Sequence, residues 1–255
     1  ITFPIGKKIY TIKGKVASTM GNGTVYTLST TPSTQWTNVT GQTTGNTISL
    51  STLSSSVSLN PVTVKAATLL ISVSSSPAAQ TIVGGGSTER VFANYQFDAS
   101  QSGEDVRFSS IPFFYTVSAG SASALTNCKL YDGATALNSG SNVVTSPTAG
   151  ANTFTLDTAY TVPKGTVKTI TLKCTVTSSS GAYSWGIAAA PSITVTGITS
   201  SNDVTEQVTS SNGQLQTVGS GSLTISKDSS SPAYTIASGG STGVTMGVLK
   251  FRAAN

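Results

Sequence analysis

LLISVSSSPAAQTIVGGGSTERVFANYQFDASQ, at residues 69–101, returns in altered form as LTISKDSSSPAYTIASGGSTGVTMGVLKFRAAN at residues 223–255. The two stretches share a Leu-x-Ile start, a Ser-Pro-Ala step, a Gly-Gly-Ser-Thr turn and a late phenylalanine, at offsets of 154 (223 − 69) or 155 (232 − 77). A period near 155 exceeds the ~20–50 residues of a solenoid repeat and suits a domain with its own core. We therefore predict an internal repeat at the scale of a domain.

The beginning of the chain repeats in the same way. ITFPIGKKIYTIKGKV at residues 1–16 matches YTVPKGTVKTITLKCTV at residues 160–176, at an offset of 159 (163 − 4) that becomes 160 (176 − 16). Residues 102–159 have no counterpart elsewhere in the sequence. The repeats predict three units: the C-terminal part of a first β-sandwich at 1–65, a complete unit at 66–220, and the N-terminal part of a third at 221–255.

Hydrophobic residues alternate with polar ones, which is typical of half-buried strands. In TITLKCTVT, at residues 169–177, Ile170, Leu172, Cys174 and Val176 share one face. The same pattern predicts a strand over 10–16 in the first unit. Further strands are expected at 68–74, 90–98, 111–118, 126–131, 153–157, 182–188, 192–198, 213–218, 222–227 and 244–252. Turn signals separate them, and no long stretch has a helical period, so the sequence predicts an all-β sandwich.

The composition narrows the function classes. Charged residues make up 9% of the chain, against about 25% on average, and histidine is absent. A hydrophobic fraction of 37% argues for a folded protein and against disorder. The net charge of +5 comes from scattered lysines, whereas nucleic-acid binding needs a clustered basic face. No apolar run reaches the ~18–20 residues that span a membrane.

VFANYQFDAS, GEDVRFSSIPFFYTVS, LTNCKLYDG and YTVPKGTVKTITLKCTV together resemble the tandem immunoglobulin-like domains of bacterial cell-surface, S-layer and fibre proteins. The resemblance covers the middle unit and part of both ends. It implies immunoglobulin-like β-sandwich repeats, one complete and two partial. It also implies an extracellular or cell-surface location and a role in layers, stalks, adhesins or fibres.

Both cysteines fall on predicted core-facing positions of the middle unit. Cys128 alternates in phase with Leu130, and Cys174 with Leu172 and Val176. We predict a disulfide between the two sheets, as in many immunoglobulin-like domains, with two buried free thiols as the alternative. Two thiols without histidine are too few ligands for a metal site.

The sequence predicts neither catalytic residues nor a cofactor. Without histidine the usual serine triad cannot be built, and Gly84-Gly85-Gly86 precedes a strand and not the helix of a phosphate loop. Glu104 and Asp105 are adjacent and therefore point apart, which indicates a solvated turn. A loose Ca²⁺ set with Asp98 is the alternative reading of these carboxylates.

Ligand and modification candidates remain. Trp36 and Trp185 could stack on sugar rings, although Tyr183 and Trp185 match Tyr26 and Leu28 of the first unit, which favours packing. Asn22 and Asn38 begin glycosylation sequons.

Incomplete units expose apolar faces and unpaired edges unless something covers them. Either the chain is a stretch of a longer one, or residues 221–255 of one subunit pair with residues 1–65 of the next. We expect a structural protein of an extracellular fibre or surface layer, assembled head to tail with copies of itself or with neighbouring repeats. An adhesin or carbohydrate-binding module that contacts glycans is the alternative.

Overall fold

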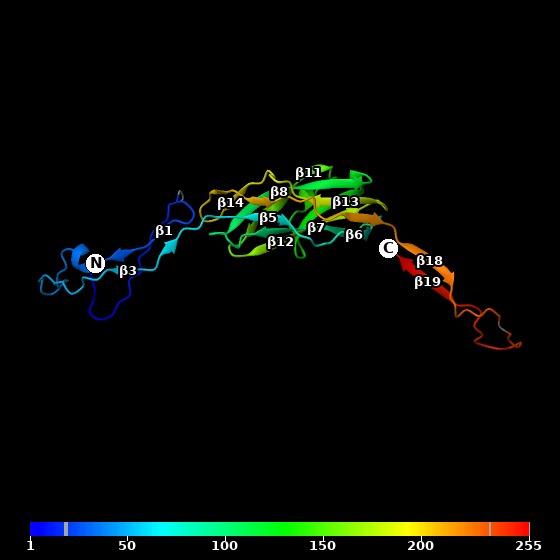
Figure 1. Cartoon of the computed structure of the whole chain (residues 1–255), viewed down its shortest axis with the longest axis horizontal. Coiled ribbons are helices and arrows are strands. Elements are labelled where there is room, and N and C mark those ends of the chain that lie inside the picture. The colour runs from blue at the N-terminus through cyan, green and yellow to red at the C-terminus, as the bar shows by residue number, and fades with distance from the viewer. Residues whose placement is uncertain (18–19, 235, 255) are drawn as a thin grey trace.

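The chain forms an elongated molecule with a β-sandwich at its centre and one arm at each end (Figure 1). The computed structural model describes residues 1–17, 20–234 and 236–254. The sandwich contains all strands between residues 70 and 219. We call residues 1–65 the N-terminal arm, and β18 (Ser222–Lys227) with β19 (Leu249–Ala254) the C-terminal hairpin.

Two mixed sheets make the sandwich. The first contains, in spatial order, β10 (Thr135–Ala136), β9 (Leu125–Asp132), β12 (Val167–Val176), β7 (Glu89–Asp98), β5 (Leu70–Val73) and β16 (Gln207–Thr209). The second contains β15 (Asp203–Val204), β14 (Val195–Gly197), β8 (Val106–Ala119), β13 (Gly181–Gly186), β17 (Gln216–Gly219) and β6 (Gln80–Val83), with β11 (Gly150–Val162) paired to β8. Short 3₁₀ turns lie at Ala122–Ala124 and Gly140–Asn142.

Aromatic side chains fill the space between the sheets. Tyr95 of β7 stacks on Phe113 of β8 with ring centroids 3.6 Å apart, and Phe97 stacks on Phe108 at 5.0 Å. All four are buried. Alternation along each strand thus directs one face of β7 toward one face of β8, and the predicted all-β sandwich is confirmed. Its immunoglobulin-like identity stays a prediction.

The N-terminal arm has little regular structure. It contains β1 (Val25–Tyr26) paired with β4 (Val62–Thr63), β2 (Ser29–Thr30) paired with β3 (Val57–Ser58), and the single-turn helix α1 (Pro32–Gln35). The strand expected over 10–16 is not formed: the described residues 1–17 contain no strand and are exposed. A strand needs a hydrogen-bonded neighbour, and none lies beside this segment.

Candidate functional site

The C-terminal hairpin repeats the pairing of β5 with β7. Adding 154 to the residue numbers of that pair (225 − 71, 251 − 97) gives the pairs of the hairpin. The matching pairs are Thr224 with Arg252, Ile225 with Phe251, Ser226 with Lys250 and Lys227 with Leu249, against Leu70 with Asp98, Ile71 with Phe97, Ser72 with Gln96 and Val73 with Tyr95. The next backbone bond also recurs, from Ser74 N to Asn94 O at 2.8 Å and from Asp228 N to Val248 O at 2.9 Å.

The N-terminal arm repeats the pairing at the other end of the sandwich. The offsets are 157 for its earlier strands (182 − 25) and 154 for its later ones (217 − 63). The matching pairs are Val25 with Thr63, Tyr26 with Val62 and Thr30 with Val57, against Ala182 with Thr217, Tyr183 with Gln216 and Ile187 with Ser211. The arm therefore has the backbone register of β13 and β17 without the rest of the sandwich.

A turn inside the arm is also duplicated. Gly41 N donates to Asn46 O at 2.8 Å, and Gly45 N donates to Gly41 O at 2.8 Å. At an offset of 156, Gly197 N donates to Asn202 O at 2.9 Å, and Ser201 N donates to Gly197 O at 3.0 Å. Our sequence comparison missed this turn, although the shared Val-Thr-Gly at 39–41 and 195–197 was a signal for it.

Positions that are buried in the sandwich are exposed in the arms. On the hairpin, Leu223, Ile225, Leu249 and Phe251 share one face and are 55–63% exposed. Their counterparts Leu69, Ile71, Tyr95 and Phe97 are at most 1% exposed. In the N-terminal arm, Tyr10, Ile12, Val16 and Leu28 are exposed, whereas Ile170, Leu172, Val176 and Trp185 are buried. Both ends thus present apolar faces whose equivalents form the core.

These two faces lie at opposite ends of the molecule (Figure 1). The junction before the sandwich is held by Gly103 N, which donates to Ala66 O at 2.9 Å, and by Ser102 Oγ, which accepts from Thr68 N at 3.1 Å. A Cβ at Gly103 would lie 2.1 Å from Lys65 O, so the close approach of these two segments of the chain requires glycine here. Within one chain, the sandwich therefore separates the two exposed apolar faces.

The predicted disulfide between Cys128 and Cys174 is confirmed. The prediction that it joins the two sheets is wrong, because β9 and β12 are neighbours in the same sheet. The ladder between them shifts register around Cys174, since Lys173 pairs with Lys129 but Thr175 pairs with Thr126. Alternation correctly predicted that both side chains point into the core, but it did not predict the order of the strands.

The two tryptophans have different environments. Trp185 is fully buried and stacks on Tyr115 at 4.7 Å, so neither face of its ring is available to a ligand. Trp36 is 43% exposed in the N-terminal arm, where its Nε1 donates to Thr30 Oγ1 at 2.8 Å and its ring stacks on Phe3 at 5.9 Å.

Both sequon asparagines are exposed. Asn38 has a positive φ of 55° in the turn after α1. The Oδ1 of Asn22 accepts from Ala66 N at 3.0 Å, which ties the arm to the junction. Attachment of a sugar at either position stays a prediction.

The carboxylates that the sequence singled out serve separate loops. Glu104 Oε2 accepts from the backbone amides of Thr199 at 2.6 Å and Ser200 at 2.8 Å. Burial raises the pKa of Glu104, but these hydrogen bonds outweigh it and the net pKa lies below its ordinary value. Asp105 accepts from Lys164 N, and Asp98 from Ser100 N. Within the described residues, no three acidic or cysteine side chains lie close enough together to hold a metal ion.

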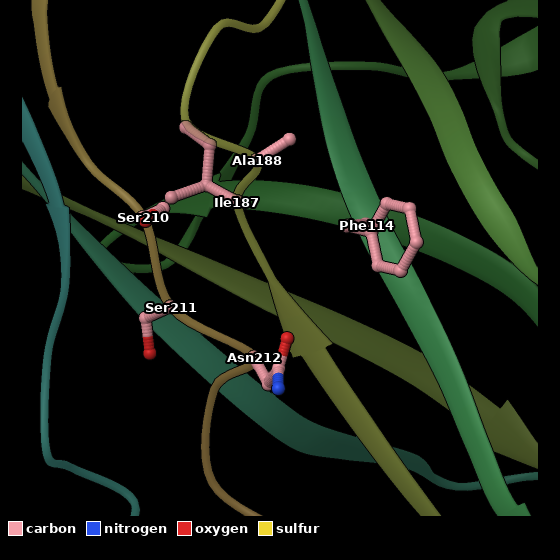
Figure 2. A pocket seen from close by; sticks show the side chains of 6 residues that line it. All are labelled: Phe114, Ile187, Ala188, Ser210, Ser211 and Asn212. Atoms are coloured by element: carbon pink, nitrogen blue, oxygen red, sulfur yellow. The ribbon is translucent and has the colours of Figure 1, made fainter.

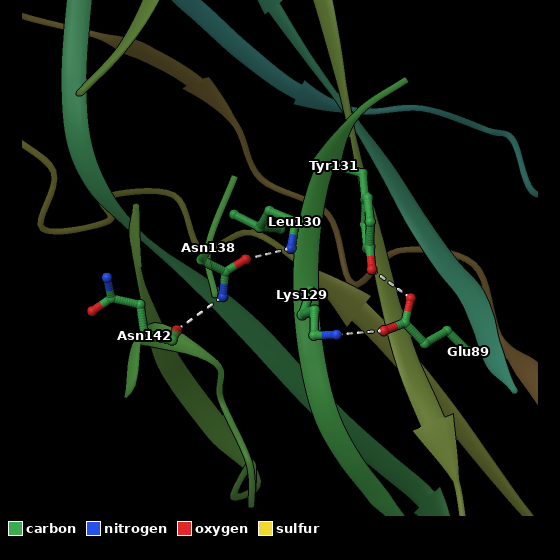
Figure 3. A network of polar contacts seen from close by, with 6 residues as sticks. All are labelled: Glu89, Lys129, Leu130, Tyr131, Asn138 and Asn142. Atoms are coloured by element: carbon green, nitrogen blue, oxygen red, sulfur yellow. Dashed lines mark hydrogen bonds and ion pairs between the residues drawn. The ribbon is translucent and has the colours of Figure 1, made fainter. Parts of the chain in front are cut away.

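A polar network supports the outer face of the first sheet (Figure 3). Glu89 of β7 accepts from Lys129 Nζ at 2.9 Å and from the hydroxyl of Tyr131, both on β9. Burial raises the pKa of Glu89, yet these hydrogen bonds and the positive charges of Lys129 and Lys173 lower the net pKa. Burial and the bond to Glu89 raise the pKa of Tyr131 to about 12.

The adjoining loop depends on a buried amide. Asn138 Oδ1 accepts from Leu130 N at 2.7 Å, and Asn138 Nδ2 donates to Asn142 O at 2.9 Å (Figure 3). These contacts and those of Glu89 hold the strands and the loop together. Each of these polar side chains has a hydrogen-bond partner within the sandwich, which indicates a structural role.

One cavity of about 360 Å³ lies where β8 meets the segment after β13 (Figure 2). It is lined by Phe114, Ile187, Ala188, Ser210, Ser211 and Asn212. This lining offers an exposed ring, hydroxyl groups and one amide, but no ionisable side chain. It therefore supplies neither a general acid nor a general base.

In comparisons with known proteins, no family model and no curated protein matches the chain. None of the helices in the described part of the chain is long and apolar enough to cross a membrane.

Proposed function

We propose that this chain is an extracellular structural protein, a subunit or segment of a fibre or surface layer, without catalytic activity. It assembles head to tail, and the C-terminal hairpin of one unit contacts the N-terminal arm of the next through β-strand pairing. The observation that supports this most directly is the exposed apolar face of the hairpin, whose equivalents at Leu69, Ile71, Tyr95 and Phe97 are core residues. The disulfide supports a location outside the cytoplasm.

The energy of the contact is consistent with assembly through both arms. Burying the exposed parts of the four hairpin side chains would contribute on the order of 4–7 kcal/mol, at ~1.5–3 kcal/mol per fully buried side chain. Association itself costs about 4–15 kcal/mol in lost freedom. The hairpin face alone is therefore marginal, and the apolar side chains and strand edges of the N-terminal arm supply the remainder. Non-closing heterologous contacts of this kind generate filaments.

A charge placed on either face of the hairpin tests the proposal. Ile225→Asp places a charge on the apolar face, and Thr224→Asp places the same charge on the opposite face of the same strand. Electron microscopy and sedimentation should show fibres or long oligomers for the parent protein and for Thr224→Asp, and single units for Ile225→Asp. A parent protein that stays monomeric at all concentrations, or two variants that assemble equally well, would refute the proposal.

A carbohydrate-binding role is the second candidate, favoured by the exposed aromatic cluster of Phe3, Tyr10 and Trp36. The rings of Phe3 and Tyr10 meet edge to face at 5.1 Å, beside the stack of Phe3 on Trp36. Since Trp185 is buried, a change in tryptophan fluorescence on adding a glycan would come mainly from Trp36. Glycan binding that disappears in Trp36→Ala, from a protein that does not assemble, would favour this second function.

A further inference from the structure

We propose that the C-terminal hairpin inserts between two segments of the N-terminal arm of a second copy, in one defined register. This inference rests on the proposed function and specifies its contact. In the sandwich, β12 lies antiparallel to β7, and β16 lies parallel to β5 on the other side. The hairpin has the register of β5 and β7, so its partners are the segments of the arm that correspond to β12 and β16.

The counterpart of β12 is the segment at residues 7–16, at the offset of 160 (171 − 11). The counterpart of β7 is β19, at 154. Shifting the observed pairs by these offsets gives the predicted ones: Ile9 with Lys250, Tyr10 with Leu249 and Thr11 with Val248, from Thr169 with Gln96, Ile170 with Tyr95 and Thr171 with Asn94. Tyr10 and Leu249 then take the places of two buried residues, Ile170 and Tyr95.

The other strand of the hairpin has a matching partner in the same arm. Residues 53–55 lie between the turn at offset 156 and β3 at offset 154. At the offset of β3, the pairs of β16 with β5 become Leu53 with Thr224, Ser54 with Ile225 and Ser55 with Ser226, in parallel orientation. One hairpin would thus lie between residues 9–12 and residues 53–55. The product is a four-stranded sheet in the order that β12, β7, β5 and β16 have in the sandwich.

We assign the acceptor arm to a second copy because the hairpin and the N-terminal arm of one chain lie on opposite sides of its sandwich (Figure 1). The hairpin cannot reach its own arm without crossing that sandwich. The contact is therefore heterologous, and each copy uses one surface to donate and a different one to accept.

Single-cysteine variants of the full chain test the register. Thr11→Cys and Val248→Cys, prepared separately and mixed under mild oxidation, place two thiols directly opposite each other on the solvent face of the new sheet. Thr11→Cys with Lys250→Cys is the matched control, shifted by two residues on the same face. The native cysteines are paired, so within the described residues they leave no competing thiol. We expect about tenfold more covalent dimer from the first mixture, because diagonal neighbours lie ~7–8 Å apart, beyond the reach of a disulfide.

Sedimentation of the same mixtures separates the two claims. If the protein assembles and the covalent dimer between positions 11 and 248 is the major product, the register is supported. If the protein assembles but the covalent dimer between positions 11 and 250 is the major product, or no covalent dimer forms, the register is wrong. Head-to-tail assembly would still stand. In a double variant that carries both Thr11→Cys and Val248→Cys, a cross-link inside one polypeptide overturns the assignment to a second copy. Absence of both assembly and dimer refutes the proposed function as well.

Discussion

Phe97 and Phe251 occupy equivalent places but should respond oppositely to truncation. Phe97 is fully buried, stacks on Phe108 at 5.0 Å and lies opposite Ile71. Phe251 is 61% exposed and lies opposite Ile225 in the same geometry. We expect Phe97→Ala to destabilise the sandwich by about 3–5 kcal/mol, the usual cost of removing a buried phenylalanine side chain.

Phe251→Ala should leave the stability of the sandwich nearly unchanged, because the hairpin lies outside it and distant sites act additively. Its cost should appear in assembly instead. With 61% of the side chain still to be buried, the contact should weaken by about 2–3 kcal/mol, which is roughly a 30- to 150-fold rise in the concentration needed for assembly.

Urea unfolding followed by the fluorescence of buried Trp185 measures the first effect, and the concentration dependence of sedimentation measures the second. The reasoning would be refuted if Phe251→Ala assembled at the parent concentration, since the exposed face would then have no role in the contact. It would equally fail if Phe251→Ala shifted the unfolding midpoint of the sandwich as far as Phe97→Ala does.

Three further predictions concern the sandwich itself. Replacing both Cys128 and Cys174 with serine removes a disulfide that closes a loop of 46 residues. The free energy of unfolding should therefore fall by roughly 4 kcal/mol in the chain-entropy model. Calorimetry measures this change, and an unchanged Tm would contradict the prediction. The pKa of Glu89 is lowered in the folded state, so its contribution to stability is present above its ordinary pKa of 4.5 and is lost as the pH falls through the folded-state pKa. The urea midpoint of the parent protein should therefore fall between pH 7 and pH 3, and it should fall less steeply in Glu89→Gln. Gly186→Ala would place a Cβ 1.9 Å from Ser211 O and should separate the ladder after β13, seen as fast amide exchange at Ile187. Gly239→Ala, with open space at its Cβ, should leave that exchange unchanged.

The strands of the sandwich were predictable because each one buries one face. Alternation placed Ile170, Leu172, Cys174 and Val176 on the buried side of β12, and the structure agrees. Strand order was not predictable from the same pattern. The disulfide between Cys128 and Cys174 was therefore predicted to join the two sheets, whereas it joins neighbouring strands of one sheet. Periodicity reports which way a side chain points, while the neighbour of a strand depends on contacts between residues far apart in the sequence.

The candidate site was predictable as a pair of stretches but not as a set of contacts. The repeat identified residues 1–65 and 221–255. The structure added the strand register within each stretch, from which the proposed contact is built. The strand β6 was missed because Gln80–Val83 is short and lies beside a glycine run. β6 pairs in parallel with β17, which lies more than 130 residues later in the chain, and no local sequence pattern indicates such a pairing.

The segment at residues 7–16 has the sequence pattern of a β-strand but does not form one, and the reason is the lack of a paired neighbour. Its sequence has the alternation of β12, and its apolar positions are those that β12 buries, yet in the single chain it forms no ladder. Strand formation is stabilised by cross-strand pairs and by burial of one face, and both are contributed by a neighbour. Among the described residues, β19 pairs only with β18, and its apolar side chains Leu249 and Phe251 are exposed as well. Under the proposed assembly, each end contributes the strands that the other end lacks, and one contact between copies would pair both.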